Sequence, residues 1–408
     1  MSWKNNFIFC IFILLGGFSF ITYAAPAEKT IIVARHCLIK RMTHPYSTLI
    51  ENQNLSLIAT DIRGIQQLIN LKQHQKKVCG GFIDVTEEWH QFTIKPVSES
   101  KKKLFLKQYD MPIHTSSETA HYSIKYEPQV NQLLHQINPQ NMWNNLTTLT
   151  NFQDRFAFSE NGVDAAKWIK NQVETIAKQT NHDNDVTVYF IDTGRFRQPS
   201  VVAKFGNEDG PGIVIGGHID SIVKDFFGRS PGADDDGSGT VTVMEVARTL
   251  LTSGMRFKKP IYFIWYAAEE MGLVGSKVVV SEFQKKRIPI EAIIQLDLTG
   301  YAPKNDSTIW LINDFVNVDL TTYLKLLIHT YVKQPSKDTQ CGYACSDHAS
   351  WYKAGFAASM PVEAAFGKED PYIHTEHDTM DILSLNHMTD FVKLGIAFAV
   401  ELAEPTNA

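Results

Sequence analysis

The stretch SPGADDDGSG, residues 230–239, places three carboxylates side by side in a glycine-rich segment. Adjacent like charges repel, so a chain that keeps Asp234, Asp235 and Asp236 together needs something to balance them. A triplet of this kind in a glycine- and serine-rich loop is more often a solvated turn or a calcium loop. The triplet alone therefore leaves its role open, and other residues must decide it.

Further polar residues follow apolar runs where buried strands are expected to end. They are His218 and Asp220 after GIVIGG, Glu269 and Glu270 after PIYFIWYAA, and Asp297 after AIIQL. Open α/β sheets bind ligands beyond the carboxyl ends of their strands. We therefore expect these side chains to meet the aspartate triplet at one edge of a sheet.

Carboxylates alone at such an edge would repel one another, so a shared positive charge is expected. Two imidazoles are available, His218 and, in the stretch IHTEHDT, His374. Two histidines with three or four carboxylates form a mixed nitrogen and oxygen ligand set that suits zinc, with cobalt or manganese as alternatives. Two metal ions ~3.5–4 Å apart can lower the pKa of a bridging water and clamp a tetrahedral intermediate. The set therefore predicts a hydrolytic two-metal centre.

The neighbouring glutamates of AAEEMGLVGS cannot both face one point on a regular backbone. One can bind metal while the other accepts the proton of the attacking water. Of the triplet, one aspartate would bind metal, and the other two need partners such as backbone N–H groups at a helix start. Taken singly, the two glutamates would more commonly be no more than a strand end and a helix start, and His374 would be an ordinary surface histidine. The joint occurrence of these groups at successive strand ends favours the catalytic one.

The elements that must position these residues lie in residues 128–408. A helix is predicted over residues 163–180, because Ala166, Ile169, Val173 and Ile176 share one face. Residues 185–193 and 199–205 read as a hairpin. Buried strands are expected at 212–218, 260–267, 292–299 and 307–314, and helices at 240–251, 318–333, 346–354 and 386–403. This alternation predicts an α/β fold, a mainly parallel, mixed central sheet flanked by helices.

The first 24 residues differ from the rest of the chain. They contain Lys4, the apolar run FIFCIFILLGGFSFI, and small residues that permit cleavage after Ala24, which is typical of a secretory signal peptide. A membrane anchor would need ~20 uninterrupted apolar residues. Gly16, Gly17 and Ser19 interrupt this run, so a cleaved signal is favoured.

Residues 25–125 carry no strong chemical motif. Strands are expected at 30–39 and 82–89 and an amphipathic helix at 61–77, which together predict a small α+β domain. The polar, turn-rich residues 110–128 read as a linker.

The composition is that of an ordinary globular chain, 44% hydrophobic and 20% charged with a net charge of −5. This balance argues against nucleic acid or an anionic membrane as a partner. Export implies an oxidising environment, in which cysteines pair. Cys10 leaves with the signal, and the remaining cysteines form two pairs by location, Cys37 with Cys79 and Cys341 with Cys345. The CGYAC stretch could instead bind metal, but no second pair of this kind matches it.

Six motifs in order closely resemble the secreted two-zinc bacterial leucyl aminopeptidases: GGHIDS, SPGADDDGSG, YAAEEMGLVGS, QLDLT, CGYACSDHASW and IHTEHDT. The resemblance covers residues 128–408 and implies the zinc exopeptidase fold. Residues 25–125 resemble the family's N-terminal propeptide, mainly through VCGGF and its position. The resemblance implies a zymogen of a secreted (periplasmic or extracellular) metalloaminopeptidase that prefers leucine or other apolar first residues.

The resemblance also implies a ligand set for two zinc ions. Asp235 would bridge both ions, His218 and Asp297 would complete the ligands of one, and Glu270 and His374 those of the other.

Roles for the neighbouring residues follow from the same resemblance. Glu269 would be the general base, and Asp220 would orient His218 by accepting from its other ring nitrogen. A cis peptide bond is expected between Asp235 and Asp236.

A pocket for the first side chain of the substrate is implied as well, with the Cys341–Cys345 bridge as one wall. Its lining would be Leu298, Ile312, Tyr343, Met360, Phe366 and Tyr372. Val362 stands where a bulkier aromatic residue is common in the family, which would widen the pocket.

The expected partners are peptides with a free N-terminus and a protease that removes the propeptide. No nucleic acid, no membrane after signal cleavage, and a monomer are expected. Two other functions compete. A glutaminyl cyclase-type acyltransferase on the same fold keeps one zinc and usually lacks counterparts of His218 and Asp235, and a non-enzymatic binding protein would lack ligands. Here none is missing.

Overall fold

The computed structural model describes residues 29–73, 79–110, 122–182, 184–206, 210–226 and 228–406. The predicted signal peptide and most of the predicted linker lie outside these residues. No helix within the described ranges is long and apolar enough to cross a membrane.

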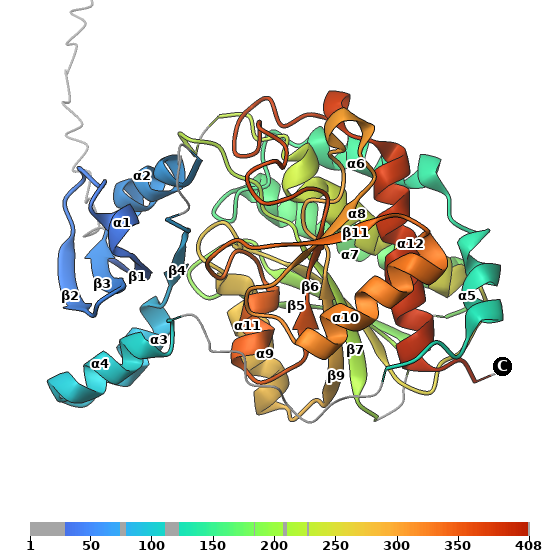
Figure 1. Ribbon diagram of the computed structural model, residues 1–408, viewed down its shortest axis with the longest axis horizontal. Coiled ribbons are helices and arrows are strands. Elements are labelled where there is room, and N and C mark those ends of the chain that lie inside the picture. Colours follow the sequence, from blue (N-terminus) through green and yellow to red (C-terminus); the bar gives the residue numbers. More distant parts are fainter. Residues whose placement is uncertain are drawn as a thin grey trace, which may run out of the picture.

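The N-terminal residues form a four-stranded antiparallel sheet with helices beside it (Figure 1). The strand order is β2 (Ser47–Glu51), β3 (Leu55–Thr60), β1 (Thr30–Arg35) and β4 (Phe82–Asp84). The helices are α1 (His36–Ile39), α2 (Ile62–Gln73), α3 (Thr86–Thr93) and α4 (Glu99–Lys107). The expected small α+β unit is present.

Two of the predicted strands in this unit are shorter than expected. The strand predicted at 30–39 ends at Arg35, and the one predicted at 82–89 ends at Asp84. Asp84 Oδ1 accepts the backbone N–H of Thr86 at 2.9 Å and its hydroxyl at 2.7 Å, which turns the chain into α3. Glu87 and Glu88 in the first turn of α3 then favour the helix.

The main body is built on a six-stranded mixed sheet in the order β12-β9-β7-β8-β6-β5. The strands are β5 (Val186–Ile191), β6 (Ser200–Phe205), β7 (Gly212–His218), β8 (Ile261–Tyr266), β9 (Ile290–Gln295) and β12 (Ala358–Ser359). β7 pairs in parallel with β8 and β9, β12 is parallel to β9, and β5, β6 and β8 pair antiparallel. The predicted mainly parallel, mixed sheet is confirmed, as is the hairpin of β5 and β6.

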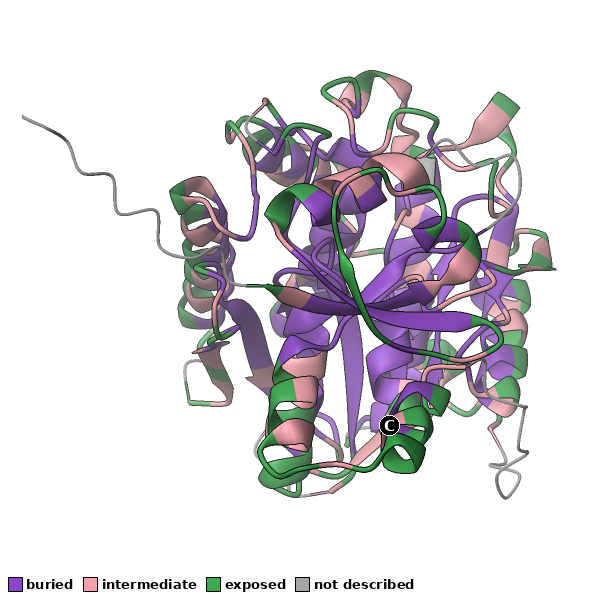
Figure 2. Ribbon diagram, turned by 90° about the vertical axis from the view of Figure 1, so that its left-hand side faces the viewer, coloured by how far each residue is buried: buried purple, intermediate pink, exposed green. Residues whose placement is uncertain are grey.

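Helices cover both faces of this sheet, so its central strands are buried throughout (Figures 1 and 2). Alternate residues along a strand point to opposite faces. Ile213 and Phe263 pack toward α7 (Glu160–Gln179), α8 (Gly239–Thr252) and α12 (Leu385–Ala403), together with α5 (Glu127–Leu134) and α6 (Pro139–Thr150). Val214 and Ile264 pack toward α9 (Val274–Lys285) and α11 (His348–Lys353). This two-sided burial explains the continuous apolar runs in the sequence.

The strand predicted at 307–314 belongs to a different sheet from its predicted neighbours. It is β10 (Ile309–Ile312), which pairs in parallel with β11 (Ser336–Thr339) and antiparallel with β13 (Pro361–Val362). An apolar run identifies a buried strand but not its partner, which explains the difference. The remaining helical segments are η1 (Ala233–Ser238), η2 (Pro303–Asn305), α10 (Val318–Leu327), η3 (Ile328–Val332) and η4 (Met380–Ile382).

The N-terminal unit packs against the main body through two apolar clusters. In one, Ile65 and Leu68 of α2 share a buried cluster with Ile222 and Met271 of the body. In the other, Phe105 of α4 is buried with residues of the body such as Phe315. These contacts place the N-terminal unit at the same edge of the main sheet as the residues singled out above.

Candidate metal centre

The predicted site residues meet at the carboxyl edge of three neighbouring parallel strands. His218 ends β7, Glu269 and Glu270 follow β8, and Asp297 follows β9. His374 comes from the segment between β13 and α12. All five side chains are nearly buried. The edge predicted from the ends of the apolar runs is therefore the one that the chain builds.

The aspartate triplet lies in η1, a wide helical turn between β7 and α8. Gly232 begins this turn with a positive φ of 50°, and a Cβ there would lie 2.6 Å from the Asp235 carbonyl oxygen. Only glycine fits that approach. The peptide bond between Asp235 and Asp236 is cis, as expected.

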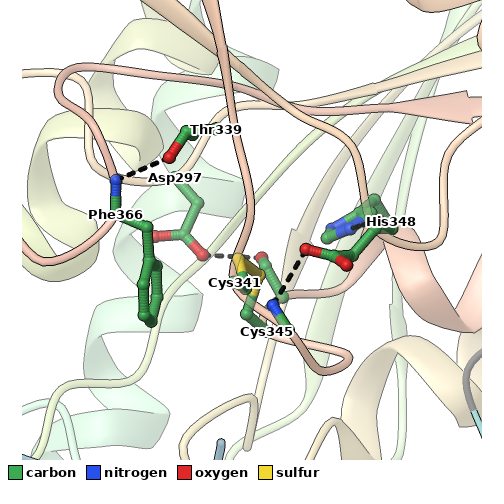
Figure 3. Close-up of a disulfide and its surroundings, with 9 residues drawn as sticks. Asp297, Thr339, Cys341, Cys345, His348 and Phe366 are labelled. Carbon is green, nitrogen blue, oxygen red and sulfur yellow. Dashed lines mark hydrogen bonds between the residues drawn. A yellow bond between two sulfur atoms is a disulfide. The ribbon is translucent and has the colours of Figure 1, made fainter. Parts of the chain in front are cut away.

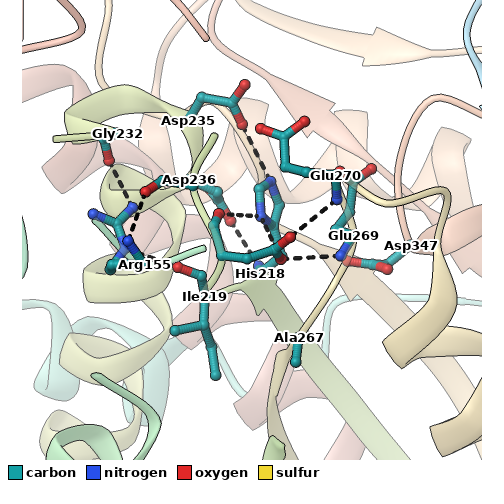
Figure 4. Close-up of polar contacts among 12 residues, drawn as sticks. Arg155, His218, Ile219, Gly232, Asp235, Asp236, Ala267, Glu269, Glu270 and Asp347 are labelled. Carbon is teal, nitrogen blue, oxygen red and sulfur yellow. Dashed lines mark hydrogen bonds and ion pairs between the residues drawn. The ribbon is translucent and has the colours of Figure 1, made fainter. Parts of the chain in front are cut away.

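Asp235 lies between the two histidines, with one carboxylate oxygen toward each (Figure 4 shows the His218 side). Its Oδ1 is 3.2 Å from His218 Nε2, and its Oδ2 is 2.9 Å from His374 Nε2. Beyond the histidines, His218 Nε2 is 3.8 Å from Asp297 Oδ1, and His374 Nε2 is 2.9 Å from Glu270 Oε2. Two clusters of ligand atoms thus share Asp235.

The other two aspartates are held by backbone N–H groups. Asp236 accepts the N–H of His218 at 2.9 Å and, at the start of α8, the N–H of Gly239 at 2.9 Å. Asp234 accepts the N–H of Gly300 at 3.0 Å. Asp236 lies within ligand reach of His218 and Asp297, but both of its oxygens are engaged in this way. Backbone N–H groups thus hold Asp234 and Asp236, while metal binding by Asp235 stays a prediction.

The donor set fits divalent metal ions. Two groups of three ligand atoms, each within 4.8 Å of one another, come from His218, Asp236 and Asp297 and from Asp235, Glu270 and His374. Within the described ranges, Glu270 Oε1 and His374 Nδ1 are buried without a hydrogen-bond partner. Buried polar atoms normally find partners, and imidazole with carboxylate is a typical zinc donor set.

The pKa shifts of the clustered side chains also fit a site for positive ions. Burial alone would lower the pKa of His374, but Glu270 and Asp235 outweigh it and raise that pKa to about 9. Burial likewise opposes the charged form of His218. The nearby carboxylates, Asp297 first and then Asp220 and Asp235, nevertheless raise the pKa of His218 well above its usual value. Burial would raise the pKa of Asp235, but the two histidines hold it well below its usual range. The cluster therefore favours positive charge at both histidines, whether protons or metal ions supply it.

Asp220 connects the first histidine to the segment that carries the glutamates. Its Oδ1 lies 3.5 Å from His218 Nδ1, which is also 3.0 Å from the Asp220 carbonyl oxygen. The same carboxylate accepts the backbone N–H of Glu269 at 2.9 Å and that of Glu270 at 3.2 Å. Asp220 thus contacts both His218 and the segment of Glu269 and Glu270, and its role in orienting His218 stays a prediction.

Two supporting residues were not predicted from the sequence. Ser346 donates its hydroxyl to Asp297 Oδ2 at 2.6 Å, which fixes that carboxylate. Asp378 accepts the backbone N–H of Asp234 at 2.7 Å and that of Asp235 at 3.1 Å. Both lie inside quoted motifs, CSDHASW and IHTEHDT, so their position beside recognised residues was the available signal.

A cavity of 450 Å³ opens beside the cluster and is lined by Glu269 together with five of the six predicted pocket residues. Those five are Leu298, Ile312, Tyr343, Met360 and Phe366, and Val362 joins them. The sixth, Tyr372, has 44% of its surface exposed and does not line the cavity. Its neighbours Pro371 and Ile373 do, so the side chain between them points outward.

Both predicted disulfides are present, Cys37–Cys79 and Cys341–Cys345. The second lines the cavity and packs with Phe366, whose N–H donates to Thr339 Oγ1 at 2.9 Å (Figure 3). This bridge holds the CGYAC loop as one wall of the cavity.

The N-terminal unit reaches the open side of the cluster through residues 79–84. Gly80 lines the cavity, and a Cβ on it would lie 2.9 Å from Tyr343 Cβ. Gly81 and Phe82 border a second, narrow gap together with Glu269. The two glycines thus let the loop lie directly against the ring of Tyr343.

The chain is similar to known proteins in both sequence and structure. Residues 200–399 match the model of peptidase family M28. Leucine aminopeptidase 1 of Coccidioides posadasii is 38% identical over 297 residues, which are 69% of this chain and 75% of that protein. The Legionella pneumophila aminopeptidase LapA matches at 40% identity with a TM-score of 0.84, over 92% of this chain and 99% of that chain. LapB of the same organism has the same identity and TM-score, over 92% and 100%.

A more distant match concerns the alternative function weighed above. Glutaminyl cyclase of Porphyromonas gingivalis is 16% identical with a TM-score of 0.54, over 64% of this chain and 97% of that chain. At that identity the match shows the fold alone.

Proposed function

Because the chain belongs to peptidase family M28 and is a metalloaminopeptidase, we propose that it removes leucine and other apolar residues from the N-terminus of peptides, with two zinc ions. The observation that carries this proposal is the position of Asp235. One of its carboxylate oxygens faces His218 and the other faces His374. His218 and Asp297 would hold one ion, Glu270 and His374 the other, and Asp235 both.

Bound zinc would supply Lewis-acid chemistry, polarising the scissile carbonyl and making a water acidic enough to attack it. The residues of the chain do the rest. Glu269 lines the cavity and is only 7% exposed, so its carboxylate can accept the proton of the attacking water in a site sheltered from bulk solvent. The same carboxylate then hands that proton to the amine of the departing peptide. The surrounding carboxylates form an anionic rim that attracts the protonated N-terminus of the substrate.

The preference for leucine-like residues rests on the cavity wall. Leu298, Ile312, Met360 and Val362 present aliphatic and thioether groups, and burying an apolar side chain against them is favourable. The cavity is bounded by the Cys341–Cys345 loop, which favours a single side chain over a longer peptide segment on that side.

Two zinc ions are favoured over the single ion of the cyclase alternative. His218 and Asp235 are both present and within ligand distance of each other, although the cyclase pattern usually lacks them. Fold similarity at 16% identity adds no support to cyclase chemistry.

The N-terminal unit supports a further part of the proposal, that the chain is a zymogen. Asp84 of β4 forms an ion pair with Arg195 of the main body and donates its backbone N–H to Gly272 at 3.1 Å. Lys277 of α9 binds Glu88 at 2.8 Å. These contacts hold Gly81 and Phe82 beside Glu269, where the departing part of a peptide would have to lie. We infer that a protease cutting near residues 110–128 releases the unit and that the active form works as a monomer outside the cytoplasm, after loss of residues 1–24.

The test is hydrolysis of leucine p-nitroanilide by the processed chain, measured with its zinc content before and after chelation. The proposal expects two zinc ions per chain, loss of activity in chelator, and recovery when zinc is restored. Asp235→Asn should stay folded, bind fewer ions and lose nearly all turnover, because an amide offers one oxygen where a carboxylate offers two. Unchanged turnover of this variant would contradict the proposal, as would activity that survives complete removal of metal.

A further inference from the structure

Arg155 is a buried cation that lies behind the aspartate triplet and that no motif marks in the sequence. It belongs to the segment between α6 and α7 and has 0% of its surface exposed. Burying a guanidinium group is costly unless its donors are satisfied, so the partners it has found indicate what it holds in place.

The partners of the guanidinium are three backbone carbonyl groups at the two ends of the loop that joins β7 to η1 (Figure 4). Its Nε donates to Ile219 at 2.8 Å, Nη1 to Pro231 at 2.5 Å and Nη2 to Gly232 at 2.8 Å. Ile219 is the residue directly after His218. Pro231 and Gly232 directly precede the turn that carries Asp235.

The Arg155 backbone is itself fixed to the same loop. Its N–H donates to Ser221 Oγ at 3.2 Å, and Ser221 donates in turn to the carbonyl oxygen of Ser230 at 3.0 Å. Its carbonyl oxygen accepts from Gln198 Nε2 at 3.1 Å. A single residue therefore ties the beginning of the loop between β7 and η1 to its end through four hydrogen bonds.

Within the described ranges, no carboxylate forms an ion pair with Arg155. Its charge acts at longer range on Asp378 and Asp236, and then on Asp220 and Asp235. A guanidinium group placed mainly to neutralise charge would be expected to contact a carboxylate directly. Its three bonds to carbonyl groups instead favour a role in geometry.

We propose that Arg155 is a positioning residue of the metal centre, which sets the spacing between His218 and Asp235 by clamping the backbone on both sides. The inference rests on the proposed two-ion function. The planar fork of arginine can reach carbonyl groups at both ends of this loop at fixed angles, which the single ammonium group of lysine cannot do. Charge alone would be preserved by lysine, so the Arg155→Lys variant separates the two roles.

The experiment compares the full chain with Arg155→Lys and with a matched control, Arg248→Lys. Arg248 also donates to a backbone carbonyl, that of Gln136 at 2.7 Å, but it lies on α8 away from the centre. Zinc affinity is measured by competition with a chelator, and the absorption spectrum of the cobalt-substituted protein reports ligand geometry. Thermal unfolding of the metal-free proteins shows whether each variant is folded.

The expected result for Arg155→Lys is a loss of about 10- to 100-fold in affinity for at least one ion, as is usual for groups that support metal ligands. Its cobalt spectrum should change, while Arg248→Lys should match the unaltered chain in both readouts. A folded Arg155→Lys with unaltered affinity and spectrum would overturn the proposal.

A milder variant decides the question if Arg155→Lys does not fold. Ser221→Ala removes one anchor of the Arg155 backbone and leaves the guanidinium in place, so it should weaken zinc binding in the same direction by a smaller factor. Unchanged zinc affinity in Ser221→Ala would then overturn the proposal. Failure of the two-ion function itself would show separately, as fewer than two zinc ions on the unaltered chain.

Discussion

Arg195 is the residue of the main body whose substitution should most directly weaken the contact of the N-terminal unit with the main body and so open the cavity beside the metal centre. It lies in the turn between β5 and β6 and binds the carboxylate of Asp84, with 20% and 4% of the two side chains exposed. Arg195→Met keeps an unbranched side chain of similar length but leaves Asp84 buried without its cation. The uncleaved precursor should therefore release its N-terminal unit more readily.

The size of the effect follows from that burial. Removing one partner of a fully buried ion pair costs about 3–5 kcal/mol. Because Arg195 is partly exposed and solvent screens the pair, about 2 kcal/mol is the appropriate figure. Since each 1.4 kcal/mol is a factor of ten, about 30-fold more of the precursor should be uncovered.

The assay is leucine p-nitroanilide hydrolysis by the precursor and by the processed enzyme, each with and without the substitution. The processed enzyme lacks Asp84, so Arg195→Met should leave its activity unchanged and serves as an internal control. Arg197→Met, which removes an ion pair with Glu160 within the main body, should change neither form. Equal activity of the unaltered and Arg195→Met precursors would show that this ion pair does not hold the N-terminal unit in place. A precursor already as active as the processed enzyme would show that the unit does not block the site.

Further predictions concern the centre and its cavity. Glu269→Gln should lower kcat by about 10²- to 10⁴-fold with zinc content retained, because it removes the proton acceptor only; loss of zinc would instead make Glu269 a ligand. Ser346→Ala removes a hydrogen bond to a charged group worth about 1.5–3 kcal/mol, so zinc should bind the Asp297 side about 10- to 100-fold more weakly. An unchanged chelator titration would contradict that. Val362→Phe should narrow the cavity and lower kcat/KM for leucine relative to alanine substrates, and an unchanged ratio would place the first side chain elsewhere.

Much of the site was predictable because its residues mark the ends of buried strands. The runs before His218 and Glu269 are apolar throughout, and in AIIQL before Asp297 Gln295 is the one polar residue, since helices cover both faces of the sheet. The histidine or acidic residue that follows each run therefore falls at the carboxyl edge. Neighbouring parallel strands bring those edges together, so the order of the motifs predicted their convergence.

The supporting contacts were not predictable in the same way. Arg155 acts through backbone carbonyl groups, and a carbonyl group leaves no mark on the identity of its residue. The outward turn of Tyr372 depends on how the chain passes between Pro371 and Ile373, which residue type does not reveal. The pairing of β10 with β11 depends on contacts between distant segments, which a local apolar run cannot specify.

The central claim is that Asp235 joins two metal ions, and anomalous scattering at the zinc edge from crystals of the processed enzyme tests it most directly. We expect two anomalous peaks of similar height, one contacted by His218 and Asp297 and the other by Glu270 and His374, with Asp235 contacting both. A single peak, or two peaks that Asp235 does not join, would contradict it.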